Sequence, residues 1–227
     1  MFKGAIFDQD GLLFDTEKIY QESWIQAAAE QGVSVPVEFP RLFCGRSPAA
    51  IAEIIQGAYP QLDIPAYCER AVRLAWDRQL AGVPEKKPGL LEMLGFCRER
   101  GIKTAVASSS TISVVRHNLE SSGVAGYFDA VVTGDEVVNG KPAPDIFLLA
   151  AERLGLDARD CCVFEDAPSG IRGAFAAGAR PVLIPDQAVP DEETLSICRV
   201  YPDLAAARDA LLPHAADASC NLLPPCV

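Results

Sequence analysis

The chain has 227 residues, enough for a sizeable hydrophobic core in one large or two modest domains. Its 31 acidic residues outnumber its 20 basic residues, and the net charge of −11 argues against nucleic acid or an anionic membrane as a partner. Hydrophobic residues make up 49% of the chain, which is typical of a globular protein rather than a disordered one.

The N-terminus runs directly into an apolar strand without a secretory signal, and no apolar run approaches the roughly 20 residues of a membrane helix. We therefore expect a cytoplasmic protein, with its eight cysteines reduced. A monomer is the favoured oligomeric state.

The first predicted element is a short apolar strand, Gly4–Phe7. Helical patterns follow at Glu17–Glu30, 40–56 and 65–80, and no strand-like alternation occurs between residues 17 and 85. This pattern predicts an all-helical insertion, residues 16–86, between the first and second strands of the main domain.

From Lys87 onward, predicted helices and strands alternate, which predicts an α/β fold with a doubly wound parallel sheet. The predicted strands are Lys103–Ala107, Asp129–Thr133, Cys161–Phe164 and Pro181–Ile184. The predicted helices are Leu90–Arg100, Thr111–Ser121, Asp145–Leu154, Ser169–Ala177 and 204–212. Residues 1–15 and 87–213 would form the α/β core, and residues 214–227 a flexible tail.

Two carboxylates, Asp8 and Asp10, follow the first strand, and Gly11 then permits a sharp turn. Ligands bind at the carboxyl ends of parallel strands, and strand alternation places both carboxylates on the same side. Such close like charges need a compensating cation, and oxygen ligands suit Mg²⁺. An Asp beside Mg²⁺ can act as a nucleophile on phosphorus. A surface Asp-Gly turn is the structural alternative.

Three further segments carry polar residues beside predicted strands or helices, and they contain Ser108, Lys141, and Glu165 with Asp166. Ser108 follows a strand and can contact phosphate, although helix capping by Ser109 or Ser110 is the simpler explanation. Glu165 and Asp166 follow another strand and favour metal binding, although acidic residues also suit a helix N-terminus.

Lys141 stands just before a predicted helix, where the helix dipole disfavours a cation. This position suggests that it neutralises Asp8 and a phosphate together, although it could also be a solvated loop lysine. Thr16 is expected to cap the helix that begins at Glu17.

Taken in chain order, the segments that contain Asp8 and Asp10, Ser108, Lys141, and Glu165 and Asp166 resemble the four motifs of the haloacid dehalogenase-like superfamily. The resemblance spans residues 1 to about 185 and implies a Rossmann-like core with a helical cap domain, residues 16–86, as in the β-phosphoglucomutase-like subfamily. It implies a Mg²⁺-dependent phosphomonoesterase of small phosphorylated metabolites, acting through an aspartyl-phosphate. The implied catalytic residues are Asp8, Asp10, Lys141 and Ser108. The implied metal ligands are Asp8, Asp10, Asp166 and Glu165, and the implied substrate contacts are Gly11, Ser108, Ser109, Lys141, Gly45 and Arg46.

Three other classes of protein are alternatives to a phosphatase. A β-phosphoglucomutase would carry a His and an in-register Arg in the cap, where this chain has Tyr20 and Pro48. A receiver-type phospho-acceptor lacks a helical insertion after its first strand. A haloacid dehalogenase needs no metal and lacks the second aspartate of the first motif, which is present here as Asp10.

Overall fold

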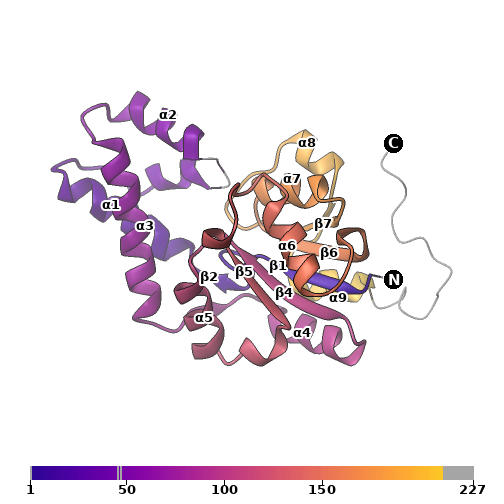
Figure 1. Cartoon of the computed structure of the whole chain (residues 1–227). Helices are drawn as coiled ribbons and strands as arrows, with labels where there is room; N and C mark the ends of the chain where they lie inside the picture. The colour runs from indigo at the N-terminus through magenta and orange to yellow at the C-terminus, as the bar shows by residue number, and fades with distance from the viewer. Residues whose placement is uncertain (1, 45, 47, 212–227) are drawn as a thin grey trace.

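A six-stranded parallel sheet forms the centre of the computed structural model, which describes residues 2–44, 46 and 48–211 (Figure 1). The strand order is β5-β4-β1-β6-β7-β8, so β1 lies between β4 and β6. The strands are β1 (Gly4–Phe7), β4 (Lys103–Ser108), β5 (Ala130–Thr133), β6 (Cys161–Glu165), β7 (Arg180–Leu183) and β8 (Arg199–Val200). The predicted doubly wound parallel sheet is confirmed, and the two-residue β8 adds an edge that the sequence pattern did not reveal.

Helices cover both faces of the sheet, because successive side chains of a strand point to opposite faces. Ala5 and Phe7 of β1 belong to one hydrophobic cluster with α4, α5 and α9, whereas Ile6 belongs to a second cluster with α6 and α7. All three side chains are fully buried. The helices are α4 (Leu90–Glu99), α5 (Ile112–Ser121), α6 (Asp145–Arg153), α7 (Pro168–Ala176), α8 (Glu192–Ser196) and α9 (Leu204–Leu211), with short 3₁₀ turns η2 (Ala125–Tyr127), η3 (Gly134–Glu136) and η4 (Ala158–Asp160).

The helical insertion contains α1 (Glu17–Glu30), η1 (Phe39–Phe43), α2 (Pro48–Ala58) and α3 (Ile64–Leu80), which lie to one side of the sheet in Figure 1. These helices have a hydrophobic cluster of their own. At its centre the Trp24 ring lies 4.8 Å from the Phe43 ring and 5.1 Å from the Tyr67 ring, each in an edge-to-face arrangement.

The single helix predicted over residues 40–56 is wrong, because the structure divides this region into η1 and α2. Pro48 is the first residue of α2. Proline suits the first turn of a helix, but its ring and its missing N–H oppose a helix continuing through it. The proline therefore starts a new helix rather than extending the preceding one.

The two chain crossings between the core and the helical insertion lie side by side. β2 (Phe14–Asp15) pairs antiparallel with β3 (Glu85–Lys86), and the Lys87 N–H donates to the Leu13 carbonyl at 3.0 Å. Two-residue strands carry no measurable periodicity, so the sequence pattern could not predict this pairing.

None of the helices in the described ranges is long and apolar enough to cross a membrane. The cysteines in those ranges, which are Cys44, Cys68, Cys97, Cys161, Cys162 and Cys198, form no disulfide. The predicted flexible tail, residues 214–227, lies outside the described residues, as does Gly45.

Candidate active site

The candidate site forms where β1, β4 and β6 end side by side. Asp8 follows β1 directly, and its N–H donates to the Phe164 carbonyl at 3.0 Å, which extends the pairing between the two strands. Glu165 is the last residue of β6, and Asp166 follows it. Adjacent parallel strands therefore bring these carboxylates together, although more than 150 residues separate them in sequence.

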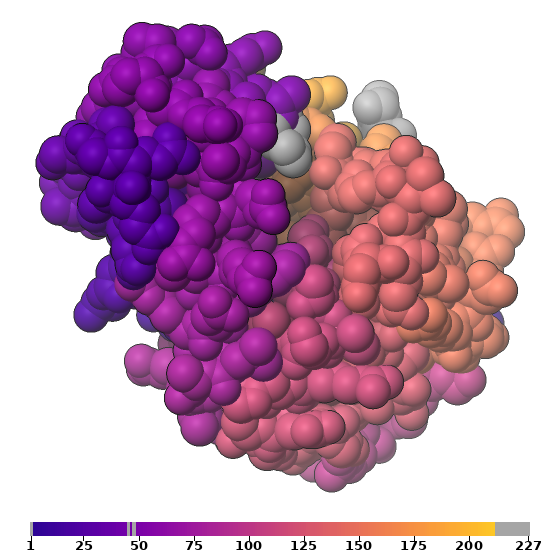
Figure 2. Space-filling model, turned by 60° about the vertical axis from the view of Figure 1, so that its left-hand side comes forward, coloured from indigo at the N-terminus to yellow at the C-terminus, as the bar shows by residue number. Residues whose placement is uncertain are grey.

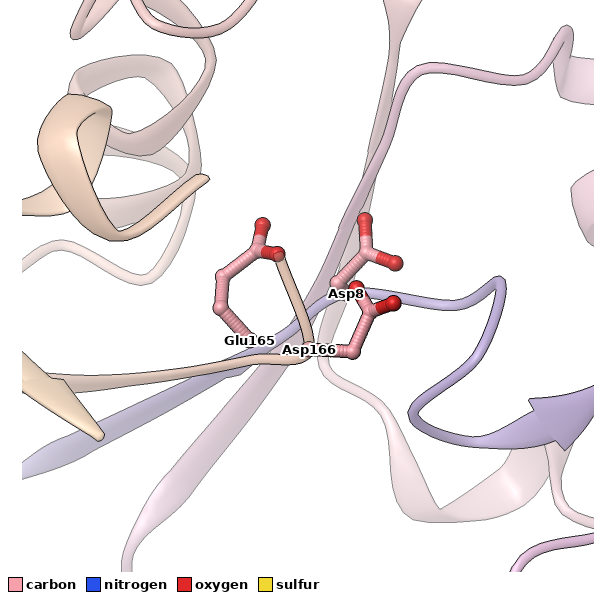
Figure 3. A group of neighbouring side chains, drawn as sticks. All are labelled: Asp8, Glu165 and Asp166. Carbon is pink, nitrogen blue, oxygen red and sulfur yellow. The ribbon is translucent and has the colours of Figure 1, made fainter. Parts of the chain in front are cut away.

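Asp8, Glu165 and Asp166 form the three-carboxylate group of this site (Figure 3). One oxygen from each lies within 4.8 Å of the others. Burial raises the pKa of Asp166 well above its usual range, and the neighbouring charges of Asp8 and Glu165 raise it further. Clustered carboxylates whose ionisation is disfavoured in this way are suited to binding a cation.

Lys141 lies against two members of the three-carboxylate group. Its ammonium group donates to Asp8 Oδ1, to Glu165 Oε1 at 2.6 Å and to the Ala107 carbonyl at 3.0 Å. Burial opposes its charge, but Asp8 and Glu165 overcome that effect and raise the pKa of Lys141. The lysine is therefore a fixed cation beside Asp8, as the sequence suggested, and not a solvated loop residue.

Asp10 has a different environment from Asp8. Thr16 Oγ1 donates to Asp10 Oδ1 at 2.8 Å, and Ser110 Oγ donates to Asp10 Oδ2 at 2.9 Å. Burial and the charge of Asp8 raise the pKa of Asp10 to about 6, against the lowering effect of the two hydroxyls. A carboxyl group that titrates near neutral pH can both give and take a proton, as a general acid and base must.

One prediction about this loop stays a prediction, and another is wrong. Asp10, a predicted metal ligand, lies outside the three-carboxylate group, and hydroxyl groups donate to both oxygens of its side chain, so its role as a ligand stays a prediction. Thr16 was expected to cap α1, but its side chain makes no capping hydrogen bond and turns to Asp10 instead.

Gly11 makes room for the neighbouring acidic group. Its φ of +82° lies in the left-handed region, and a β-carbon here would lie 2.5 Å from Asp166 Oδ2. Its N–H donates to the Phe14 carbonyl at 2.9 Å within the turn, and the contact of Gly11 with phosphate stays a prediction.

Ser108 ends β4, Ser109 and Ser110 follow it, and the three side chains have different surroundings. Ser108 is 1% exposed, and its hydroxyl accepts from the Ser110 N–H at 3.1 Å, so it is set back from the cavity that Ser109 and Ser110 line. Ser109 therefore matches the predicted phosphate contact better than Ser108 does. Ser110, expected only as a helix cap, instead binds Asp10.

These groups line a cavity of about 370 Å³ between the core and the helical insertion. Figure 2 shows a hollow between the purple surface of the insertion and the orange surface of the core. The core contributes Asp8, Asp10, Ser109, Ser110, Lys141, Glu165, Asp166, Ala167 and Ser169, and the insertion contributes Glu17, Tyr20, Arg46, Ile51, Val72 and Trp76. The structure thus places the predicted substrate contact Arg46 at the cavity.

A second cavity, of about 580 Å³, shares Arg46 and Ser169 with the first. Arg41 and Arg172 also line it, so a basic region adjoins the acidic site in a chain of strongly negative net charge. Arg172 is paired with Asp191, whereas no ion pair involves Arg41 or Arg46 within the part of the chain that the structure describes.

Three residues of the site have roles that their sequence context does not reveal. In the sequence, Tyr20 marks only a departure from the mutases, and Ser110 suits a helix cap. Asp186, which follows β7, was not identified at all. It lies beside Asp166, whose pKa its charge raises, and its Oδ1 accepts from Lys87 at 2.8 Å. The rule that ligand-binding residues follow parallel strands could have pointed to it.

The donor set fits a magnesium ion. Asp186 Oδ2 is buried and has no hydrogen-bond partner among the described residues, and it lies on the same side of Gly11 as Asp166 Oδ2. Four carboxylates thus gather near two lysines, Lys141 and Lys87, which leaves an excess of negative charge lined by oxygen atoms. Such an arrangement suits a hard divalent cation. Asp166 is the best placed ligand of the three-carboxylate group, because Lys141 donates to one oxygen of Asp8 and to one oxygen of Glu165.

Known proteins are similar to this chain in sequence and in fold. The family model described as haloacid dehalogenase-like hydrolase matches residues 2–178. A phosphorylated carbohydrates phosphatase of Thermotoga maritima is 33% identical over 176 residues, covering 78% of this chain and 82% of the relative. The fructose-1-phosphate phosphatase YqaB of Escherichia coli is 34% identical over 178 residues, covering 78% and 93%.

A solved structure of a β-phosphoglucomutase from Clostridium difficile has the same fold, with a TM-score of 0.76 over 95% of this chain and 97% of that one. Its sequence is 21% identical, so this likeness concerns the fold alone. The chain belongs to the haloacid dehalogenase-like hydrolases. Its phosphatase relatives identify it further as a phosphatase of that family.

Proposed function

We propose that this phosphatase is a Mg²⁺-dependent phosphomonoesterase that forms an aspartyl-phosphate on Asp8. The observation that carries the proposal is the pairing of two aspartates with opposite environments. Asp8 lies against the Lys141 ammonium, whereas Asp10 is held by two hydroxyls with a pKa of about 6. One group is thus suited to attack phosphorus as an anion, and the other to move protons.

The first step forms the bond between Asp8 and phosphorus. Because Lys141 occupies Oδ1, Oδ2 is the oxygen that attacks. The bond from phosphorus to the substrate oxygen breaks, and Asp10 gives that oxygen its proton, so that a neutral alcohol leaves. Lys141 neutralises charge on the phosphoryl oxygens, and the Ser109 hydroxyl donates to one of them.

The second step regenerates Asp8. Asp10, now ionised, takes a proton from a water molecule as that water attacks phosphorus. The bond between phosphorus and Asp8 breaks, and inorganic phosphate leaves. Asp8 and Asp166, with Asp186 beside them, would hold Mg²⁺, which when bound supplies the positive charge that a phosphate dianion needs at this acidic site.

The substrate is proposed to be a small phosphorylated metabolite of the sugar phosphate or phosphoglycolate type. A cavity of about 370 Å³ fits a molecule of this size, and the insertion that forms one wall would act as a cap that excludes water. Arg46 lies where it can contact the sugar or acid part of the substrate. The relatives that act on phosphorylated carbohydrates and on fructose 1-phosphate support this class.

The alternative activity is that of a β-phosphoglucomutase, which returns the phosphoryl group to a second sugar hydroxyl. It is less favoured, because the chain has Tyr20 and Pro48 at the two cap positions where mutases carry His and Arg. Incubation with β-glucose 1-phosphate, followed by phosphorus NMR, separates the two activities. A phosphatase releases inorganic phosphate, whereas a mutase accumulates glucose 6-phosphate.

A substrate panel tests the main proposal. Phosphate release is measured for hexose phosphates, phosphoglycolate and p-nitrophenyl phosphate, with Mg²⁺, with EDTA, and after Mg²⁺ is restored. Activity should vanish with EDTA and return with Mg²⁺, and Ca²⁺ should inhibit because its larger, looser coordination misplaces the phosphate for in-line attack. Undiminished hydrolysis in EDTA would refute metal dependence.

A further inference from the structure

The Tyr20 hydroxyl connects the helical insertion to the proton-transfer group of the core. Tyr20 lies on α1, and its hydroxyl oxygen is 3.3 Å from Ser110 Oγ in the loop after β4. Ser110 Oγ lies 2.9 Å from Asp10 Oδ2, and Thr16 holds the other carboxylate oxygen. A continuous row of hydrogen bonds thus runs from the insertion to Asp10.

The proton of each hydroxyl in this row can be assigned. A carboxylate only accepts, so Ser110 must give its single proton to Asp10 when that group is ionised. The Ser110 oxygen is then left as an acceptor, and the Tyr20 hydroxyl must be the donor to it. Each bond in such a chain polarises the next, so a donor on Ser110 strengthens its bond to Asp10.

The surroundings of Tyr20 support this direction. Burial raises the pKa of its phenol, and the side chains of Ser110, Gln79 and Trp76 lower it. The Trp76 N–H can only donate, so it cannot accept the phenol proton. Trp76, on α3, lines the same cavity as Tyr20, and Gln79 Oε1 already accepts from Asn118 at 2.7 Å, so the phenol proton is directed to Ser110 of the core.

We propose that Tyr20 is a positioning residue that fixes Asp10 for proton transfer only while the helical insertion lies against the core. The contact between Tyr20 and Ser110 joins two units that are linked by the β2–β3 pair, so it is lost if the insertion moves away. Asp10 then keeps its bond to Thr16, which directly follows β2 at the junction between the core and the insertion, but its bond to Ser110 is weakened. Closure over a substrate is thereby coupled to the alignment of the acid and base.

This assignment rests on the proposed function, because it gives Tyr20 a role only if Asp10 moves protons. If Tyr20 only stabilised the fold, its loss would slow the release of all leaving groups equally, whereas the proposed role predicts a difference between them. Loss of the hydroxyl should slow the release of an alcohol, which needs a proton from Asp10, far more than the release of nitrophenolate, which needs none. Binding of the substrate should change little.

The test compares Tyr20→Phe with Tyr67→Phe in the holoenzyme with Mg²⁺. Tyr67 is a matched control, because its buried hydroxyl lies in the same insertion and has no hydrogen-bond partner among the described residues. Leaving-group release is followed in single turnovers with fructose 1-phosphate and with p-nitrophenyl phosphate. We expect Tyr20→Phe to slow the sugar ester about tenfold, as loss of roughly one hydrogen bond would, the nitrophenyl ester less than about twofold, and KM less than about twofold.

A second comparison tests whether Tyr20 acts through Ser110. The double variant Tyr20→Phe with Ser110→Ala should be no slower than Ser110→Ala alone, because both changes interrupt one row of bonds. Equal effects of Tyr20→Phe on the two esters, equal behaviour of Tyr20→Phe and Tyr67→Phe, or full additivity would each overturn the assignment. A wild-type enzyme that cleaves neither ester would instead refute the proposed function, and this assignment with it.

Discussion

The Glu165 carboxylate occupies the space that a side chain at Gly170 would need. A β-carbon on Gly170 would lie 2.0 Å from Glu165 Cδ and 2.2 Å from Oε1, the oxygen that accepts from Lys141. Gly170 lies in the first turns of α7, so the glycine allows the end of β6 and the start of α7 to enclose this carboxylate. The position of Lys141, and through it the environment of Asp8, therefore depends on the absence of a side chain at Gly170.

Gly170→Ala should displace Glu165 and lower both stability and activity. We expect the free energy of unfolding to fall by about 1–3 kcal/mol, as for overpacking of a close-packed site, and kcat to fall at least about tenfold as Lys141 shifts. Denaturant unfolding and phosphate release measure the two effects. Gly95→Ala, also within a helix but with nothing near its added carbon, is the control and should raise stability by about 0.5–1 kcal/mol. A Gly170→Ala variant as active and stable as the wild type would contradict this account.

Asp8→Asn should remove the proposed nucleophile with almost no change in volume. Turnover should fall by several orders of magnitude, because the amide that replaces the carboxylate is a poor nucleophile. Folding should survive, and the metal-free variant should melt no lower than the wild type, because repulsion within the three-carboxylate group decreases. Phosphate release and thermal melting measure both outcomes, with the exposed Asp77→Asn as a control. More than a few per cent of residual activity would exclude Asp8 as the nucleophile.

The metal-free protein should lose stability as the pH rises from about 5 to 8. The pKa of Asp10 is raised to about 6 and that of Asp166 is raised well above its usual range, mainly by burial in both cases. The folded state therefore binds more protons than the unfolded state above the ordinary carboxyl pKa of about 4, and stability must fall as those protons leave. Lys141, whose pKa is also raised, stays charged throughout this range.

Thermal melting in EDTA and in Mg²⁺ at several pH values checks this prediction. The stabilisation by Mg²⁺ should grow with pH, because the cation binds the ionised carboxylates. Asp166→Asn should flatten the pH dependence of the metal-free protein. A melting temperature in EDTA that rises between pH 5 and 8 would show that the acidic cluster does not dominate the pH response.

Arg46→Gln should weaken the binding of substrates that carry a second anionic group. Arg46 lines both cavities, and loss of a charge-assisted hydrogen bond of about 1.5–3 kcal/mol corresponds to roughly a ten- to hundredfold change. We expect kcat/KM for phosphoglycolate to fall by at least about tenfold and that for p-nitrophenyl phosphate by less than about twofold. Arg73→Gln, which lines a separate cavity beside α3, is the control. An equal loss for both substrates would place Arg46 at the transferring phosphate instead.

The sequence was sufficient for the parts of the fold that depend on local pattern. Apolar strands followed by acidic residues identified Asp8 and Asp166, and the alternation of helices with strands predicted that these residues would meet at one edge of a sheet. The cavity position of Arg46 was also anticipated, although its role stays a prediction.

The remaining features depend on contacts that no local pattern encodes. Ser110 was read as a helix cap, because its partner Tyr20 reaches it only when the insertion packs against the core. Thr16 was assigned to the helix that follows it, although Asp10 competes for the same hydroxyl. Asp186 follows β7, a position to which the strand-end rule could have pointed, but only the fold shows that it lies beside Asp166.

Because β2 pairs with β3, the whole insertion could be replaced by another segment during evolution. Asp15 and Glu85 stand opposite each other in an antiparallel pair, and such partners lie about 4.5–5.5 Å apart, so the 69 intervening residues leave and rejoin the core at one point. Another segment of different length could be grafted there without moving β1 or β4. Selection could thus exchange the substrate-recognition part of such an enzyme while the phosphoryl-transfer part is inherited unchanged.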